Sequence, residues 1–285
     1  MNFRILVFLA LILLAGCGDE DYGNNSTENN SYHPVEIEPT ISHDGNYVYY
    51  VVNDTSIDST SGVYRALIII PEKQKMVPGV NLHSPSINFN DSVIAYLDSG
   101  KVHYFNRYNF STDTSLYGQR FNNIFYLVDS VLIGYRQGAG YNDSIFIIDE
   151  SGVWFKTAGW TPTFVDERVY TYFESEDDST YNLVRRNAQY ILDSAILMEI
   201  EEPFLKPQYP SYLPVSNQIV FSFFRDSKWR ICTAYVDSSH YTVIDSSDYP
   251  KALMIAENWF VYTGISGRLV MSNFNGSFKT LFISD

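Results

Sequence analysis

The sequence, 285 residues long, has few of the residues and motifs that usually indicate catalysis or metal binding. It contains two cysteines and five histidines, and no two histidines have the H-x-x-x-H or H-E-x-x-H spacing typical of metal sites. No G-x-S-x-G elbow is present to hold a hydrolase nucleophile. Loops distant in sequence can still converge on a site, but nothing local encodes one. We therefore predict no catalytic residue, no metal and no cofactor, and we lean against an enzyme.

Basic residues are also scarce. The chain has 19 Lys and Arg against 33 Asp and Glu, for a net charge of −14. A surface of this sign repels phosphate backbones and anionic lipid headgroups, so we expect no nucleic-acid partner. Charged residues make up only 18% of the chain, so its solubility depends on Ser, Asn and Thr.

The longest apolar run covers residues 5–14 and follows Arg4. It is too short for a spanning helix of about 20 residues and has the length of a signal-peptide core. The run ends in Leu14-Ala15-Gly16-Cys17, which resembles the lipobox of bacterial lipoproteins. The resemblance implies cleavage before Cys17, a lipid on its sulfur and acylation of its new amine. We expect residues 1–17 to be this signal peptide; the alternative is an ordinary secretory signal with an accidental cysteine.

Residues 18–34 are rich in Asp, Glu, Asn and Ser, with no periodic apolar positions. Such a segment cannot bury enough surface to offset chain entropy, so we expect a flexible acidic tether. The residue after Cys17 is Gly18. By resemblance to lipoprotein sorting in Gram-negative bacteria, glycine here does not hold a protein at the inner membrane. We expect a lipid-anchored envelope protein on the periplasmic face of the outer membrane, with surface exposure as the alternative.

A repeated hairpin pattern organises the rest of the chain. Residues 39–50 place Asp44-Gly45, the strongest short turn signal, between β-branched and aromatic residues. Residues 85–96 repeat the pattern, and weaker copies start near 122, 162, 210 and 250. A period near forty residues with four short strands per unit is typical of propeller blades. We predict an all-β fold, a six-bladed β-propeller of four-stranded blades over residues 35–285.

Further strands are expected after each hairpin. Third strands are predicted at 63–70, 101–106, 144–149, 181–186, 229–236 and 268–274, and fourth strands at 74–78, 113–117, 153–157, 241–245 and 277–283. The segment 191–200 fits helix or strand, and its context favours strand. Residues 35–37 are expected to add to the final blade and help to close the ring.

The unit at 39–50 resembles the TolB-type propeller repeat, usually written P-x-W-S-P-D-G, and the unit at 85–96 resembles it with Asn88 in place of the serine. The resemblance implies the propeller fold. TolB proteins also carry an α/β domain before the propeller, where this chain has only the expected tether. The related propellers of prolyl oligopeptidases precede a hydrolase domain, which we also do not expect here.

Aromatic residues make up 16% of the chain. Trp160, Tyr209, Tyr212 and Tyr249 lie near the prolines that begin the repeats, where they could stack on sugar rings at one mouth of a channel. Packing between blades is the favoured alternative for these side chains. We predict a module that binds an envelope protein or peptide; the alternative is a carbohydrate-binding protein or carbohydrate-active enzyme.

Three weaker signals remain. Cys232 lies in an apolar strand and is predicted to be a small buried hydrophobe. Loop histidines such as His43 and His83 are expected to be plain surface residues. The acidic segment 174–178 lacks the glycine of calcium loops and is predicted to be a solvated hairpin tip.

Overall fold

The computed structural model describes residues 34–114, 118–138, 143–175, 177, 179–188, 193–201, 205–238 and 240–283. The predicted signal peptide, with Cys17, and all but the last residue of the predicted tether lie outside these residues.

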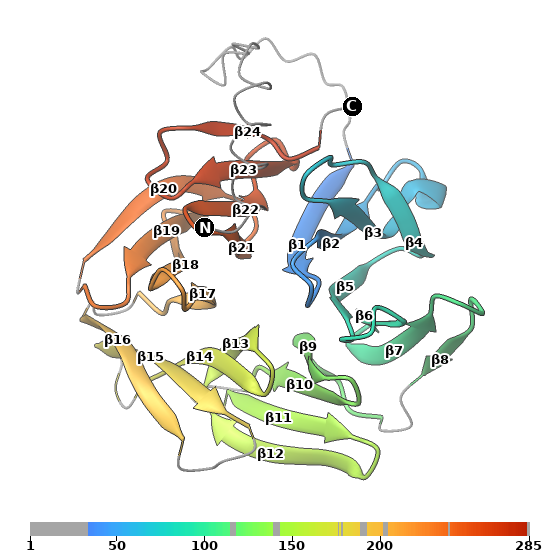
Figure 1. The fold of residues 1–285 in the computed structure, drawn as a ribbon, viewed down its shortest axis with the longest axis horizontal. Helices are drawn as coiled ribbons and strands as arrows, with labels where there is room; N and C mark the ends of the chain where they lie inside the picture. Colours follow the sequence, from blue (N-terminus) through green and yellow to red (C-terminus); the bar gives the residue numbers. More distant parts are fainter. Residues whose placement is uncertain are drawn as a thin grey trace.

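Six four-stranded sheets are arranged around a central axis, and in each the strand order follows the sequence order (Figure 1). Blade 1 has β1 (Val35–Ile41), β2 (Tyr47–Asn53), β3 (Gly62–Leu67) and β4 (Gln74–Pro78); blade 2 has β5 (Leu82–Ile87), β6 (Val93–Asp98), β7 (Lys101–Asn106) and β8 (Thr112–Thr114); blade 3 has β9 (Asn123–Val128), β10 (Val131–Arg136), β11 (Ser144–Asp149) and β12 (Gly152–Ala158). Blade 4 has β13 (Trp160–Asp166), β14 (Val169–Glu174), β15 (Thr180–Asn187) and β16 (Ser194–Glu201); blade 5 has β17 (Gln208–Leu213), β18 (Gln218–Arg225), β19 (Lys228–Tyr235) and β20 (Tyr241–Ser247); blade 6 has β21 (Ala252–Ala256), β22 (Trp259–Thr263), β23 (Leu269–Asn273) and β24 (Lys279–Leu281). All pairings within blades are antiparallel, so the predicted all-β, six-bladed propeller is confirmed.

In five of the six predicted hairpins, those of blades 1, 2, 4, 5 and 6, a residue with positive φ allows the tight bend. In blade 1 this residue is Gly45, with φ of 71°. The carboxylate of Asp44 accepts hydrogen bonds from the Ser42 hydroxyl at 2.6 Å and the Asn46 amide at 3.0 Å. These local bonds fix the turn and, with it, the register of β1 against β2.

The ring closes in a different way from the one expected. Val35 pairs with Asn53, so residues 35–37 belong to blade 1 and do not add a strand to blade 6. The two blades are joined instead through Glu36, whose side chain is fully buried. Its amide donates to the carbonyl of Gly267 at 2.7 Å, and its carboxylate accepts the Leu269 amide at 2.9 Å.

Two cations also meet the carboxylate of Glu36. Lys73 Nζ lies 2.7 Å from Oε1, and Arg268 Nε lies 3.5 Å from Oε2. The carbonyl of Glu36 accepts the Thr263 hydroxyl at 2.7 Å. One residue of the first strand thereby connects blade 1 to two strands of blade 6, a polar substitute for a shared strand.

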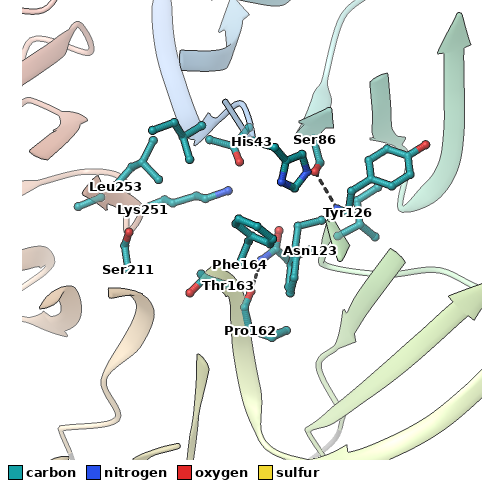
Figure 2. Close-up of a pocket in the computed structure, with 15 residues that line it drawn as sticks. His43, Ser86, Asn123, Tyr126, Pro162, Thr163, Phe164, Ser211, Lys251 and Leu253 are labelled. Atoms are coloured by element: carbon teal, nitrogen blue, oxygen red, sulfur yellow. Dashed lines mark hydrogen bonds between the residues drawn. The ribbon is translucent and has the colours of Figure 1, made fainter. Parts of the chain in front are cut away.

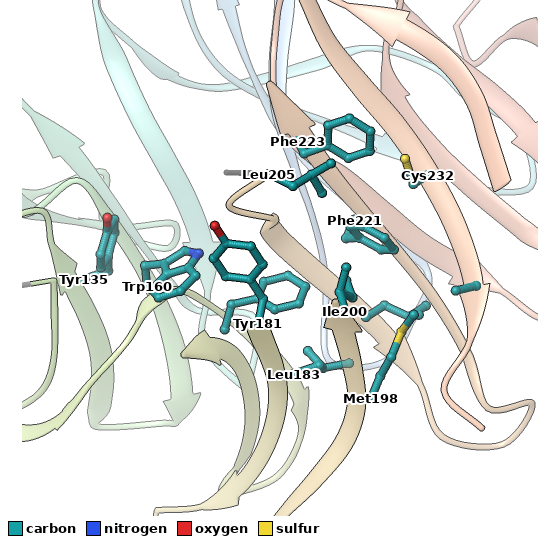
Figure 3. Close-up of a cluster of buried hydrophobic side chains, with 13 residues drawn as sticks. Tyr135, Trp160, Tyr181, Leu183, Met198, Ile200, Leu205, Phe221, Phe223 and Cys232 are labelled. Atoms are coloured by element: carbon teal, nitrogen blue, oxygen red, sulfur yellow. The ribbon is translucent and has the colours of Figure 1, made fainter. Parts of the chain in front are cut away.

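Aromatic and aliphatic side chains fill the wedges between blades. Figure 3 shows one such cluster, which includes Phe221 and Leu183. In the same cluster Phe221 packs edge-on against Phe173 at a centroid distance of 6.0 Å. Cys232 is fully buried in this cluster, as predicted. The cluster also contains Trp160, which is 7% exposed.

Candidate functional site

The central channel is formed by the first strand of every blade. A pocket there is lined by residues of β1, β5, β9, β13, β17 and β21, so it lies on the propeller axis (Figure 2). Its volume is about 40 Å³, enough for about three water molecules. We call the end where these strands begin the proline end, and the end where they turn back the hairpin end.

The proline end is built from strained backbone. Four residues that directly precede a proline have φ between 45° and 57°, although proline disfavours helical conformations in the residue before it. They are Glu38 before Pro39, Ser84 before Pro85, Thr161 before Pro162, and Tyr209 before Pro210. At each one the register of the first strand shifts, as in a β-bulge. A bulge re-aims the local side chain, and here it does so in four blades at the same level.

These residues connect neighbouring blades. The carboxylate of Glu38 accepts a short hydrogen bond from the Ser84 amide, and the hydroxyl of Thr161 accepts one from the Tyr209 amide at 2.8 Å. Glu38 Oε1 also lies 3.2 Å from His83 Nδ1. Burial alone would raise the pKa of Glu38, but the hydrogen bond and charge of His83 hold it below its usual range. The same hydrogen bond raises the pKa of His83 against the opposing effect of burial.

A second ion pair lies at this end, between blade 3 and the segment that joins blades 4 and 5. Lys206 Nζ is 2.7 Å from Asp143 Oδ2, and Lys206 also stands over the ring of Trp160 at 4.9 Å from its centroid. The pKa of Tyr135 is raised by burial and by the charge of Asp143. Burial and the charge of Glu38 raise the pKa of Tyr209 in the same way, so both phenols stay protonated at neutral pH.

Lys251 also lies at the proline end, and it takes part in neither of these ion pairs. Its side chain is 9% exposed, and Figure 2 shows its nitrogen directed into the pocket. Within the described residues, no hydrogen bond or ion pair to its Nζ is formed; Glu38 acts on it through space. Burial lowers the pKa of Lys251, and the charge of Glu38 opposes that shift.

The hairpin end is aromatic. The ring of His43 stacks on Phe89 at a centroid distance of 3.5 Å and meets Phe164 edge-on at 4.5 Å. Burial lowers the pKa of His43 to about 4, against the raising effects of a hydrogen bond to the Ile87 backbone and of the Asp129 and Asp44 charges. His43 is therefore a neutral packing residue at physiological pH, and the expectation that it is a plain surface histidine is wrong.

A shallow groove of about 500 Å³ lies on the proline end between blades 2 and 3. Its lining residues are His83, Leu97, Gly100, Arg120, Phe121, Asn122, Arg136 and Gln137. Arg120 and Arg136 are both exposed, and Arg136 lies over the ring of Phe146 at 4.7 Å. This groove concentrates positive charge in a chain whose net charge is −14.

The four aromatic residues predicted as binding candidates do not form one platform. Trp160 is buried, and its indole nitrogen donates to the carbonyl of Pro207 at 2.6 Å. Tyr209 and Tyr249 are partly exposed near the proline end, whereas Tyr212 lies at the opposite end and donates to Asn217 of the hairpin loop at 3.2 Å. Packing between blades is therefore the role of Trp160.

Sequence reasoning missed Glu38, His83 and Lys251 as site residues. A signal was present, because Glu38 directly precedes a repeat-leading proline and Lys251 directly follows one. The repeat pattern placed these positions near one another in the ring, but it gave no reason to expect a left-handed backbone before proline. Only that bulge aims Glu38 across the blade boundary.

Two negative findings apply to the described part of the chain. No group of three or more His, Cys, Asp or Glu side chains there could hold a metal ion. None of its helices has the length and apolarity needed to cross a membrane.

No known sequence family and no curated protein sequence matches the chain. The chain does resemble solved structures in its fold. It is similar to TolB from Acinetobacter baumannii, with a TM-score of 0.57 and 12% sequence identity over 76% of this chain and 56% of that one. It is also similar to a putative TolB from Agrobacterium tumefaciens (TM-score 0.53, 12% identity, 77% of this chain and 84% of that one).

An oligogalacturonate lyase in complex with manganese has a comparable TM-score of 0.52 at 9% identity, over 86% of this chain and 75% of that one. At these identities the likeness establishes the fold alone, and propellers of this kind occur in enzymes and in non-enzymes. This chain spans little more than half of the Acinetobacter protein. The fold is that of the TolB-like six-bladed propellers.

Proposed function

We propose that this chain is a lipid-anchored envelope protein whose propeller binds another envelope protein, or a peptide segment of one, at the proline end. The groove between blades 2 and 3 carries this proposal, because it presents Arg120 and Arg136 beside a strained, charged channel mouth. Its volume of about 500 Å³ suits a short peptide segment. Positive charge in an acidic protein attracts an acidic partner and orients it.

The TolB-like neighbours support an envelope location for this protein. The anchor itself rests on the lipobox at Cys17. Two or more acyl chains give stable membrane attachment, whereas one gives only marginal binding. A Cys17→Ser variant should move from the membrane pellet to the soluble envelope fraction, and a variant that pelleted like the wild type would contradict the anchor.

Site-specific crosslinking in native membranes tests the binding surface. A photoreactive amino acid is placed at Gln137, which lines the groove, and in a second strain at Val215, which is 85% exposed on the β17–β18 hairpin loop. We expect a discrete protein adduct from position 137 and none from position 215. A reversed pattern would place the interface at the other end of the propeller.

The competing carbohydrate hypothesis now depends on Tyr209 and Tyr249, because Trp160 is buried. A pyranose ring is too large for a channel pocket of about 40 Å³, so a sugar would have to bind at the rim. A glycan array probed with the full chain in detergent separates the two classes. Saturable glycan binding that is lost in Tyr209→Ala, together with no protein adduct, would favour carbohydrate.

A further inference from the structure

Lys251 has an unusual position for a lysine. The residue is only 9% exposed, and its nitrogen points into the axial pocket. No described residue forms a hydrogen bond or an ion pair with this nitrogen. Lysines are almost never buried to this degree unless a partner compensates the charge. The carboxylate of Glu38 acts on Lys251 through space, but it is already engaged by His83 and the Ser84 amide.

Two hydroxyl groups line the same pocket and have protons to donate. Ser86 accepts the Tyr126 amide at 2.8 Å, and Ser211 accepts the Met254 amide at 3.0 Å. Within the described residues, neither hydroxyl donates a hydrogen bond. Each serine has therefore used a lone pair to join two blades and keeps its O–H available, as donors around an anion require.

The size of the pocket decides which anion fits. About 40 Å³ corresponds to about three water molecules, which matches the three heavy atoms of a carboxylate group. A uronate carries its carboxylate directly on a sugar ring, and that ring is too large for a pocket of about 40 Å³. A peptide C-terminus carries its carboxylate at the tip of an extended chain, so the carboxylate can enter a small pocket ahead of the residues that precede it.

We propose that the axial pocket binds the C-terminal carboxylate of a peptide, with Lys251 Nζ as the charged donor in a pocket that the hydroxyls of Ser86 and Ser211 also line. This inference rests on the proposed peptide-binding function and names the group that the partner inserts. The bound carboxylate supplies the partner that Lys251 lacks. It also favours the charged amine and so opposes the effect of burial on the Lys251 pKa.

The test uses the full chain in detergent and a random heptapeptide library synthesised twice, once with free C-terminal carboxylates and once with C-terminal amides. We expect the wild type to retain the free acids about tenfold or more above the amides, because a charge-assisted contact is lost in the amide. Equal retention of both libraries would overturn the carboxylate site. This comparison needs no mutant, so a folding defect cannot obscure it.

Two variants assign the discrimination to Lys251. Lys251→Met and Lys251→Gln should bring the acid-to-amide ratio to within about twofold of unity, since both remove the charge. Lys101→Met is the matched control, because Lys101 is exposed on β7, and it should behave as the wild type. If the two Lys251 variants keep the wild-type ratio while near-ultraviolet circular dichroism reports a native fold, the site is wrong.

Peptide retention without any preference for the free acid would leave the proposed function standing and remove this inference alone. If the wild type retained no peptide from either library, both the proposed peptide-binding function and this inference would be wrong. Glucuronate is added as a competitor beside acetate at equal ionic strength. If glucuronate displaces the free-acid peptides much better than acetate, the carboxylate belongs to an acidic sugar and the peptide assignment is overturned.

Discussion

The two ends of the axial channel are made from the same six strands and differ in almost every physical respect. At the proline end, Glu38 and His83 form an ion pair on strained backbone, and Lys251 is buried without a bonded partner among the described residues. At the hairpin end, His43 and Phe89 stack as neutral rings. Around the channel the charged side chains face the proline end and the stacked rings the hairpin end, although the β5–β6 turn at the hairpin end also pairs Asp91 with Arg65 and Arg107.

For the proposed binding function, this difference favours the proline end as the ligand-binding end. Backbone strain and incompletely paired buried charge both cost stability, and proteins retain them where they serve binding or catalysis. Stacked aromatic rings at the hairpin end contribute stability through packing, although the Nδ1 atom of His43 is buried there without a hydrogen-bond partner among the described residues. The histidines of the two ends make the contrast measurable, because the pKa of His83 is raised while that of His43 is lowered.

The largest effect is expected from breaking the polar closure near the proline end. Glu36→Ala removes a fully buried carboxylate and leaves Arg268 and the Leu269 amide without it. Removing one partner of a buried ion pair costs about 3–5 kcal/mol. We expect the urea midpoint of unfolding to fall accordingly. Glu72→Ala, at an exposed neighbouring glutamate, is the control and should lie within about 0.5 kcal/mol of the wild type.

How much of this was accessible from the sequence depends on the separation of the interacting residues. The hairpin turn at Asp44-Gly45 was predicted correctly because all of its contacts lie within a few residues. Residues 35–37 do help to close the ring through Glu36, but their predicted addition to the final blade is wrong. The contacts that close the ring lie far apart in the sequence, since Thr263 and Leu269 meet Glu36 across 227 and 233 residues. No local periodicity records a contact of that range, and strand propensity alone favoured adding residues 35–37 to the last blade.

In the candidate site, too, local features could be predicted from the sequence and contacts between blades could not. The prolines that begin the repeats revealed the blades, yet the conformations of Glu38 and Tyr209 before them follow from contacts between blades. Trp160 and Tyr209 both looked like binding aromatics in the sequence. Burial separates them, and burial in a propeller depends on the neighbouring blade.

An intermediate effect is expected at the hairpin end on acidification. His43 has a pKa of about 4 in the folded protein, against an ordinary value of 6.5. The unfolded chain therefore binds a proton first, so this contribution to stability is complete above about pH 6.5 and is lost as the pH falls toward about 4. The loss amounts to about 2–3 kcal/mol. His43→Phe, which keeps the stack on Phe89, should lack this component in urea titrations across the same range; parallel pH profiles for both proteins would contradict it.

The smallest effect is expected at the proline end, and it has the opposite sign. The hydrogen bond and charge of Glu38 raise the pKa of His83, so the pair contributes fully below the ordinary histidine range and is lost as the pH rises through the raised pKa. Solvent screens this contribution, because the His83 side chain is 43% exposed. His83→Gln keeps a donor for Glu38 without a charge. The wild type should therefore exceed the variant in urea midpoint at about pH 6, and the two should converge by about pH 8.5, while His240→Gln on an exposed loop follows the wild type throughout. A gap that widens with rising pH would mean that Glu38 and His83 do not share a proton-dependent bond. The electrostatic contrast between the two ends would then rest on Lys251 and the Lys206–Asp143 pair.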